Sequence, residues 1–587
     1  MRLFIAEKPS LGRALVEVLP KPHQKNNGFI KAGNGDVVTW CIGHLLEQAE
    51  PEAYNPDYKK WAVEHLPIVP KEWKLVVKPN TKKQFSVVKK LIKQADVLVN
   101  MGDPDRVGQI LIDEVINHCG VSKAKKTEVL RCLISDLNPT SVKKALNNLR
   151  KNTDFIPLAT SALARARADW LYGINMTRLC TLQGRQSGYT GVLSIGRVQT
   201  PVLGLIVHRD LEIANFVSKP FYEVICTLKT LKGELYKAKW RPSKACEPYM
   251  DEDNRVLSKA LASSVISKIQ NKSGKILQVP KEHLNDVEQV AGAISNSCSA
   301  LIDAARNANY SLKSKAWNDS KVSAHHAIIP TSKSTDLSRL SPAENNIYEL
   351  VARQYLIQFY PPFEYVDKQI DTEVSGGLFI SKQKDVVSQG WKALFPSKQK
   401  SQGESEFSAV SLPNVSKGDE AHCQQADLIE KQTTPPNYFT DATLLSAMTG
   451  IARYVTDASI KKVLRDTDGL GTEATRAGII ELLFKRQFLT RKGKDIRATD
   501  VGTQLICSLP ERMTIPDMTA HWESQLEAIS QKELKYAQFM NPITNNLDLL
   551  INEVKSVTFS GLKGKGTPYK PKGSFKPKAK RSRKLKN

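Results

Sequence analysis

The sequence predicts a multidomain protein that combines α/β with α+β architecture. Residues 1–150 alternate short apolar runs with amphipathic helical patterns, which is typical of a doubly wound parallel sheet. Residues 151–215 have long helical patterns, whereas strand patterns begin at about residue 216. With 587 residues, the chain has room for about four ordinary domains, each with its own hydrophobic core.

The first region is predicted to contain buried strands at residues 3–6, 37–42, 97–99 and 129–134. A helix that Asn138 caps and Pro139 opens follows them. The first strand ends at Glu7, and the third ends just before Asp103 and Asp105. Because open α/β sheets place their sites at the carboxyl ends of parallel strands, we expect these three carboxylates to face one another across one cleft.

Two carboxylates separated by one residue suit a hard cation such as Mg²⁺, which takes a few carboxylate ligands and fills its other positions with water and phosphate oxygens. Glu7 is a candidate third ligand or a general acid/base, and Lys8 is placed to hold a phosphate. The alternative for Asp103 and Asp105 is an Asx-type turn that opens a helix.

Two short motifs resemble a known family. Ala-Glu-Lys-Pro-Ser at residues 6–10 and Gly-Asp-Pro-Asp-Arg at residues 102–106 resemble the Toprim domain of type IA DNA topoisomerases. The resemblance implies that the chain acts on DNA with Mg²⁺ and without ATP. The family carries Asp-x-Asp-x-Glu at the second motif, but position 107 is a valine, which cannot ligate a metal. One Mg²⁺ ion on Glu7, Asp103 and Asp105 is therefore expected, and the case for a second is weakened.

A second region with a chemical signal is a long arginine-edged helix at residues 161–178, followed by a loop at residues 191–201. We interpret it as a clamp on a nucleic-acid backbone, with arginines on phosphates, neutral side chains as hydrogen-bond donors, and a glycine that lets the strand approach. The predicted DNA-binding residues here are Trp170, Arg178, Arg185, Ser194, Gly196, Arg197, Gln199 and Thr200. The alternative is a solvated basic helix and an ordinary loop. Residues 194–201, Ser-Ile-Gly-Arg-Val-Gln-Thr-Pro, also resemble the single-strand groove of the same family.

Three further residues are predicted to bind DNA. Trp61 offers a face on which a base could stack, although such tryptophans are more often part of a core. Thr472 and Arg476 lie in a segment that resembles the second half of the groove domain, where they could hold a phosphate. Thr440 is expected to cap a helix in the same segment.

The resemblance divides the chain into seven segments around a hole. They are a Toprim domain at 1–150, the first part of a helical groove domain at 151–215, the first part of a β hinge domain at 216–275, a truncated remnant of the tyrosine domain at 276–360, the second part of the hinge at 361–432, the second part of the groove domain at 433–555, and a disordered basic tail at 556–587. Residues 241–254 resemble an insertion that one branch of the family uses in decatenation, and the alternative is a plain surface loop.

The family's nucleophile is missing from the sequence. Residues 321–331 match its histidine motif, which implies that His325 contacts the scissile phosphate. The family attacks DNA with a tyrosine in a Tyr-x-Arg setting, and none of the 16 tyrosines has an arginine two positions later. Tyr310 is the nearest downstream tyrosine, but it lacks the neighbours that would activate it. We therefore expect that a block that includes the tyrosine is absent near residues 275–280.

Composition agrees with a polyanionic partner. The formal charge is +25, and no apolar run approaches the roughly 18 residues that a membrane span needs. The N-terminus does not resemble a secretory signal, and the nine cysteines include no C-x-x-C pair, which argues against a zinc ribbon and for a reducing cytoplasm. We expect a bacterial cytoplasmic monomer on nucleoid or plasmid DNA that prefers single strands.

Two functions follow from these observations. The resemblance favours a Mg²⁺-dependent type IA topoisomerase, whereas the missing tyrosine favours a catalytically silent relative that binds single-stranded DNA, including the product of a decaying gene. A Toprim primase or nuclease is disfavoured, because those proteins lack the motifs at residues 194–201 and 324–331.

Overall fold

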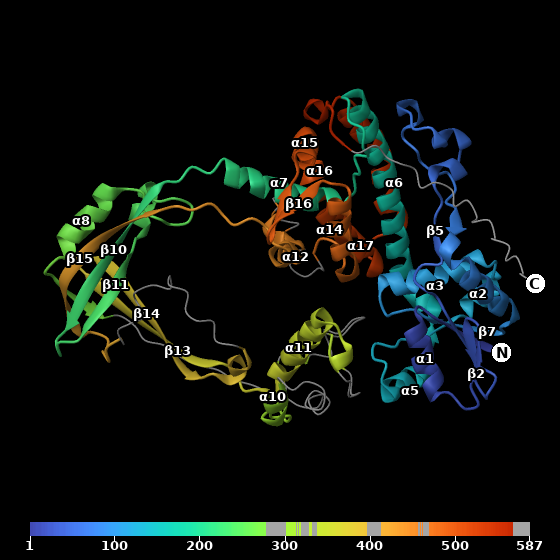
Figure 1. Cartoon of the computed structure of the whole chain (residues 1–587), viewed down its shortest axis with the longest axis horizontal. Coiled ribbons are helices and arrows are strands. Elements are labelled where there is room, and N and C mark those ends of the chain that lie inside the picture. The colour runs from blue at the N-terminus through green and yellow to red at the C-terminus, as the bar shows by residue number, and fades with distance from the viewer. Residues whose placement is uncertain are drawn as a thin grey trace, which may run out of the picture. The chain divides into compact units, whose positions relative to one another are not determined.

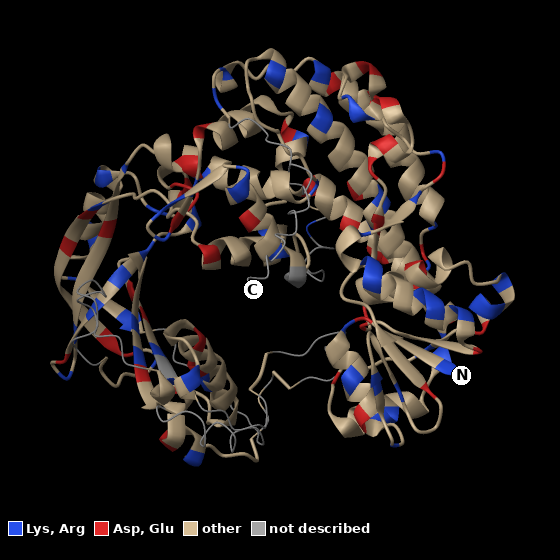
Figure 2. Cartoon of the chain, turned by 45° about the vertical axis from the view of Figure 1, so that its right-hand side comes forward, with Lys and Arg blue, Asp and Glu red and all other residues tan. Residues whose placement is uncertain are grey.

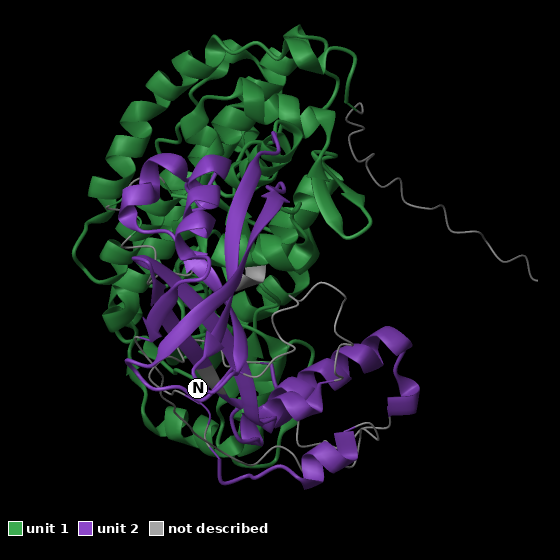
Figure 3. Cartoon of the chain, turned by 90° about the vertical axis from the view of Figure 1, so that its left-hand side faces the viewer, with its two compact units in different colours: residues 1–215, 323–325, 436–587 green, residues 216–322, 326–435 purple. Residues whose placement is uncertain are grey.

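The computed structural model describes residues 1–276, 301–312, 314, 316–317, 328–330, 337–395, 412–455, 458, 461 and 469–566. The chain forms two compact units (Figure 3). The first unit contains residues 1–215 and the described residues from Pro436 on, and the second contains the described residues from Phe216 to Pro435.

A seven-stranded sheet organises the start of the first unit, with the order β2-β3-β4-β1-β7-β8-β9. The central strands β4 (Val37–Trp40), β1 (Arg2–Ala6), β7 (Val97–Met101) and β8 (Leu130–Arg131) are parallel. The edge strands β2 (Gln24–Asn26), β3 (Phe29–Lys31) and β9 (Arg150–Lys151) are antiparallel. The sheet is therefore mixed at its edges, and the predicted strands at 37–42 and 129–134 are shorter than expected.

Helices cover both faces of this sheet (Figure 1). Alternate residues of β1 point to opposite faces, so Phe4 packs with α1 (Pro9–Val18) and α5 (Pro139–Asn147). Ile5 packs on the other side with α2 (Lys82–Gln94) and α3 (Arg106–His118). The apolar residues of β1 are buried because both faces are covered, as in a doubly wound fold.

The helical part of the first unit is assembled from distant segments of the chain. The 31-residue helix α6 (Ile156–Gln186) packs against α17 (Asp517–Ser530) and α18 (Tyr536–Lys555), as Figure 1 shows. The other elements are α7 (Gln199–Ala214), α12 (Asp441–Thr449), α14 (Glu473–Lys485), β16 (Leu489–Lys492), β17 (Asp495–Ala498), α15 (Asp500–Ser508) and α16 (Glu511–Thr514). They share one hydrophobic core, and Thr440 caps α12 as expected.

Residues 556–566 belong to this helical part and not to a disordered tail. Phe559 and Leu562 are fully buried in the core. The backbone N–H of Gly564 donates to the carbonyl of Gly188 at 3.1 Å, so the segment closes over the end of α6. Residues 567–587, the rest of the predicted basic tail, lie outside the described residues.

The second unit contains a closed antiparallel barrel with the strand order β10-β11-β14-β13-β12-β15. Its strands are β10 (Pro220–Thr230), β11 (Leu235–Arg241), β12 (Ser273–Ile276), β13 (Glu364–Val374), β14 (Gly377–Ser388) and β15 (Glu420–Gln432). Every second residue of β10 and β11 points inward, including Val224, Leu228 and Ala238. Helix α8 (Lys259–Ile269) packs against β10 and β15.

A small helical cluster forms the rest of the second unit. Helices α10 (Ile302–Arg306) and α11 (Pro342–Leu356) pack around the fully buried ring of Phe359. Ile347 and Leu350 on α11 are 62% and 57% exposed. Within the described parts of both units, no helix is long and apolar enough to cross a membrane.

Candidate metal centre and nucleic-acid interface

The parallel pairing of β1 with β7 brings the first predicted acids together. Ala6 lies opposite Met101, so Glu7 and Asp103 follow at the same edge of the sheet. The Asp103 N–H donates to Glu7 Oε2 at 2.9 Å, and Lys8 Nζ lies 2.6 Å from Asp103 Oδ2. The sequence therefore located this cluster of Glu7, Lys8 and Asp103, and Lys8 is engaged by a carboxylate.

Asp105 belongs to the same loop but has a structural task as well. Its Oδ1 accepts a hydrogen bond from the Gly108 N–H at 2.7 Å and so caps α3. The glycine at position 108 is required, because a Cβ there would lie 2.4 Å from the backbone N and O atoms of Asp103. The helix-opening turn and the acidic cluster, which were alternatives at the level of sequence, are thus two aspects of one loop.

Electrostatics at the cluster favour an added positive charge. Burial raises the pKa of Glu7, and the charges of Asp103 and Asp105 raise it further, while the Asp103 N–H and Lys8 lower it. A cation would relieve this repulsion. However, no group of three or more His, Cys, Asp or Glu side chains in the described residues is arranged to hold a metal ion. Magnesium would fit only if Asp103 exchanged Lys8 for the ion, and Val107 adds no ligand.

Arg131, which the sequence analysis did not identify, holds the loop that carries Asp103 and Asp105 through hydrogen bonds to its backbone. This fully buried side chain donates to the carbonyls of Gly102 at 2.7 Å and Asp103 at 2.8 Å. Burial lowers its pKa to about 10, against the attraction of nearby acids. The only signal in the sequence was an arginine inside an apolar run, which is rare unless the charge is paired.

A cavity of about 970 Å³ holds five of the predicted DNA-binding residues, and we call it the groove cavity. They are Trp61, Trp170, Arg178, Arg185 and Ser194, and the wall also includes Lys59, Arg486, Glu50 and Glu52. The guanidinium groups of Arg178 and Arg185 lie 5.2 and 5.7 Å from the Trp61 ring centroid. Lys and Arg residues also occur throughout both units (Figure 2).

The two arginines beside Trp61 differ in exposure. Arg178 is 4% exposed and donates from Nη1 to the carbonyl of Tyr58 at 2.6 Å, so it fixes the loop that carries Trp61. Burial lowers the pKa of Arg178, although Glu52 and Glu50 oppose this. Arg185 is exposed and remains available to a phosphate.

Residues 192–198 form the expected loop, but its polar side chains contact one another before α7. Gln199 Nε2 donates to Ser194 Oγ at 2.8 Å, and the Gly196 N–H donates to Thr200 Oγ1 at 3.1 Å. Helix α7 already begins at Gln199. The predicted neutral donors of this segment therefore hold one another, because the motif has to start a helix.

Arg197 is 3% exposed and lies in an ion-pair network that the sequence did not reveal. Its Nε is 2.6 Å from Asp169, and its Nη2 is 3.0 Å from Glu523 on α17. Glu523 also pairs with Arg106 at 3.7 Å and Arg165 at 3.6 Å. Burial alone would raise the pKa of Glu523, but the three arginines hold it below its ordinary value. A role for Arg197 as a direct phosphate ligand is thus not supported by its geometry.

A second cavity, of about 470 Å³, lies between α3, α6 and the start of α14, and we call it the α3–α14 cavity. Its wall includes Val107, Arg197 and Thr472 from the predicted set. Thr472 caps α14 together with Thr475. Arg476 is 6% exposed, with Nε 3.4 Å from the carbonyl of Leu470. His325 lies outside the described residues.

Comparison with known proteins identifies the class. A family model of the Toprim domain matches residues 2–137, and a DNA topoisomerase model matches residues 154–290 and 278–541. The fold is similar to full-length topoisomerase I from Thermotoga maritima, with a TM-score of 0.56 at 16% identity, over 94% of this chain and 90% of that one. Sheet, acidic loop and matched models together define a type IA DNA topoisomerase, which confirms the predicted fold class.

The particular branch follows from closer relatives. The chain is 50% identical to DNA topoisomerase 3 of Haemophilus influenzae over 94% of both chains. It is 48% identical to DNA topoisomerase 3 of Pasteurella multocida over the whole of both chains. The chain belongs to the DNA topoisomerase III family.

The same comparisons bear on the gap predicted near residues 275–280. The alignment with the Pasteurella multocida protein extends over 655 positions, although this chain has 587 residues. That relative therefore contains sequence with no counterpart here. The topoisomerase model matches in two pieces that meet at residues 278–290, next to the predicted gap.

Proposed function

We propose that this chain binds single-stranded DNA as a topoisomerase III relative that has lost the strand-cleavage step. The proposed DNA binding is supported mainly by the position of Arg178 and Arg185 over the Trp61 ring in the groove cavity. An aromatic face with a cation beside it suits unpaired bases and their phosphates, whereas a duplex keeps its bases stacked inside. The formal charge of +25 supports the same partner.

Loss of cleavage is supported by the missing Tyr-x-Arg motif and by the longer alignment with the relative. The alternative is an active type IA topoisomerase with a substitute nucleophile, and Tyr310 is the nearest candidate. Its hydroxyl donates to the carbonyl of Ala305, and its ring packs 5.5 Å from Phe359. These contacts favour a structural tyrosine.

The proposal includes one Mg²⁺ ion on Glu7, Asp103 and Asp105, without ATP or zinc. A bound Mg²⁺ would neutralise phosphate charge beside the acidic loop. Because Lys8 pairs with Asp103 in the structure, we expect weak binding of the ion. We also propose that the chain acts as a monomer in the bacterial cytoplasm, on chromosomal or plasmid DNA.

The experiment is a titration of a labelled single strand and of the matching duplex, followed by fluorescence anisotropy at several salt concentrations. We expect tighter binding of the single strand and a steep loss with salt. Arg185→Ala should weaken binding to all sequences alike and reduce the salt slope by about one. Arg150→Ala, at an exposed edge of the sheet, is the matched control. Equal affinity for the duplex and the single strand would contradict the proposal.

A further inference from the structure

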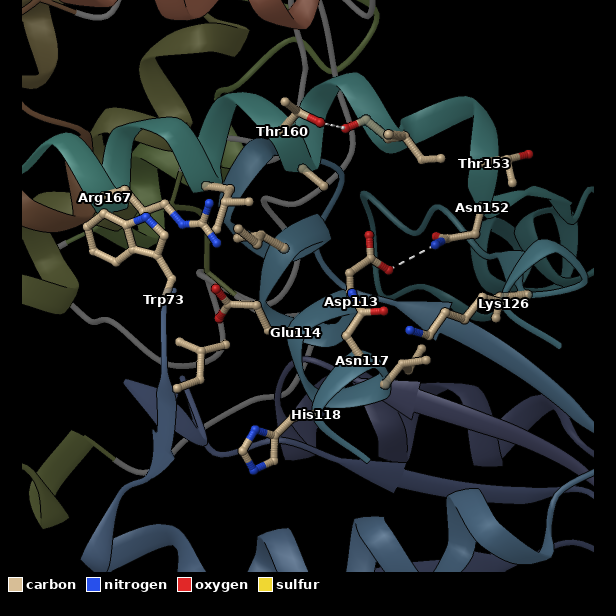
Figure 4. Close-up of a pocket in the computed structure, with 17 residues that line it drawn as sticks. Trp73, Asp113, Glu114, Asn117, His118, Lys126, Asn152, Thr153, Thr160 and Arg167 are labelled. Carbon is tan, nitrogen blue, oxygen red and sulfur yellow. Dashed lines mark hydrogen bonds between the residues drawn. The ribbon is translucent and has the colours of Figure 1, made fainter. Parts of the chain in front are cut away.

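A third cavity, of about 590 Å³, lies between α3 and α6 in the first unit, and we call it the α3–α6 cavity (Figure 4). Helix α6 faces it with residues at helical spacing, from Ile156 and Thr160 to Leu163 and Arg167. Different residues of α6, such as Arg165, line the α3–α14 cavity. The two cavities thus use different faces of α6, although Leu75, Ile110 and Glu114 line both. No residue of the predicted DNA-binding or metal site lines the α3–α6 cavity.

The wall of this cavity combines apolar side chains with polar ones, which include Asp113, His118 and Asn152. The apolar part comprises Leu75, Ile110, Ile116, Val129, Ile156, Ala159 and Leu163. Glu114, Arg167 and the Trp73 indole lie together at one end, and Lys126 and Asn117 lie at the other (Figure 4). A cavity of this size, with an apolar part and convergent polar groups, has the dimensions of a small-molecule site.

Glu114 is an acidic group in this wall whose side chain has no partner among the described residues. Its carboxylate makes no hydrogen bond or ion pair with any described residue, whereas the adjacent Asp113 accepts from Asn100 at 3.0 Å and from Gln109 and Asn152 at 2.8 Å each. Burial raises the pKa of Glu114 to about 7, although Arg167 lowers it. Because buried carboxylates are usually paired, a ligand with N–H donors would complete this one.

Arg167 is held in place beside Glu114. Its guanidinium lies 5.1 Å from the Trp73 ring centroid, and Nη1 donates to the Tyr536 hydroxyl at 2.8 Å. The ligand therefore meets two acceptor oxygens next to a fixed donor group, with an indole at the same end. The side chain of Lys126 at the other end makes no hydrogen bond or ion pair in the described part of the chain and can meet an anionic group.

This arrangement matches the edge of one base in particular. Guanine presents N1–H and a 2-amino group, which can donate to both oxygens of a carboxylate, and its O6 beside them accepts from a guanidinium. Adenine has no two adjacent donors of this kind, and thymine has no amino group. We propose that the α3–α6 cavity binds a guanine base, with Glu114 on N1–H and the 2-amino group, Arg167 on O6, and Lys126 toward the phosphate side.

The test is calorimetric titration of guanosine monophosphate into the full chain, without DNA. We expect saturable binding and at least about tenfold weaker binding of adenosine monophosphate. Glu114→Gln, which keeps the shape but replaces one acceptor by a donor, should weaken guanosine monophosphate binding by about tenfold or more. Glu128→Gln, at an exposed position nearby, is the matched control. Absence of binding, equal binding of the adenine nucleotide, or an unchanged Glu114→Gln variant would each overturn the proposal.

A guanine base can come from a free nucleotide or from a DNA strand, and a second arm separates these sources. Binding of an all-thymine strand is compared with binding of the same strand with one guanine. If the guanine strand binds more tightly and Glu114→Gln removes this difference, the cavity binds a base of the strand. If guanosine monophosphate binds but the two strands bind equally, the cavity binds a free nucleotide. Arg185→Ala should weaken strand binding but leave guanosine monophosphate binding unchanged, so a failure of the groove is distinguishable from a failure of this cavity.

Discussion

At position 107, the side chain lies in the first turn of α3, one residue before the glycine that lets this helix approach Glu7. Val107 is 39% exposed and lines the α3–α14 cavity, so a longer polar side chain has room there. The acidic loop keeps three carboxylates, one of which caps a helix and one of which pairs with Lys8. A fourth carboxylate at position 107 would therefore offer a bound cation a ligand that is not already engaged in a contact within the protein.

The first prediction is that Val107→Glu tightens Mg²⁺ binding by about tenfold, or about 1.4 kcal/mol. The physical reason is an additional oxygen ligand and a further negative charge beside Glu7 and Asp103. Isothermal titration with Mg²⁺ measures the effect. Val107→Gln, of similar size but neutral, is the control, and equal affinities of the two variants would mean that position 107 does not face the ion.

The second prediction concerns stability and pH at Glu114. Its pKa is raised to about 7 from an ordinary value of 4.5, so the folded state binds the proton more tightly than the unfolded state. This group therefore stabilises the fold below its unfolded pKa, and that stability is lost as the pH rises through the folded value. As the pH rises from about 5 to about 8, the free energy of unfolding of the Glu114→Gln variant should increase by on the order of 1–3 kcal/mol relative to that of the parent chain. Unfolding by urea at several pH values measures it, and a difference that is constant with pH would contradict the burial argument.

Charged residues show where sequence reasoning reaches its limit. Glu7, Asp103 and Lys8 could be located because strand ends are visible as breaks in apolar runs. The burial of Arg178 and Arg197 could not, because a basic residue in an amphipathic helix or a loop is usually solvated. Their partners, Tyr58 and Glu523, are distant in the sequence, and no local pattern connects them.

At the scale of elements, the contact between α6 and α17 depends on one buried acid. Glu523 on α17 meets Arg165 of α6, Arg106 of α3 and Arg197 in the turn before α7. Thr519 on the same helix donates to the carbonyl of Arg197 at 2.5 Å. Glu523 on α17 therefore connects the start of α3 with α6 and with the turn before α7.

The third prediction is that Glu523→Ala destabilises the packing of α6 on α17 by about 3–5 kcal/mol, because it leaves buried positive charge with only Asp169 to compensate it. Hydrogen exchange of α6 and α17 amides should rise by a corresponding factor. Glu533→Ala, an exposed position just after α17, is the control. If exchange rises equally in both variants, the network does not hold these helices together.

Element boundaries were predicted where local chemistry decides them. Thr440 as a cap of α12 and Asn138 as a cap of α5 follow from side chains that accept backbone hydrogen bonds. The start of α7 at Gln199 was missed, because the contacts among residues 194–200 are visible only in three dimensions. The prediction of a disordered tail was wrong for residues 556–566. It rested on the many lysines of the whole tail and overlooked two buried apolar residues, Phe559 and Leu562.

At the scale of the whole molecule, matches to the Toprim and DNA topoisomerase models cover most of the chain. The described residues between β12 and β13 form a small core around Phe359. Ile347 and Leu350 on α11 are exposed next to this core. The family and fold class could be predicted from short motifs, since those motifs mark strand ends and helix caps that the fold requires.

The last prediction is that the chain neither relaxes negatively supercoiled DNA nor forms a covalent adduct with it. Covalent catalysis needs a nucleophile that later leaves when the strand is resealed, and Lys8 and His325 can stabilise phosphate charge but cannot take this role. Attack by water would leave a free nick.

The assay incubates the chain with labelled single-stranded DNA and Mg²⁺, denatures the mixture, and compares the mobility of the label. A shifted band that survives denaturation and disappears in Tyr310→Phe would identify Tyr310 as a replacement nucleophile and refute the loss of cleavage. A band that persists in Tyr310→Phe would refute it as well, with the attacking residue then found by mapping the labelled peptide. An unshifted label, together with retained single-strand binding, is the expected result, because the groove residues and the nucleophile belong to separate segments of the chain.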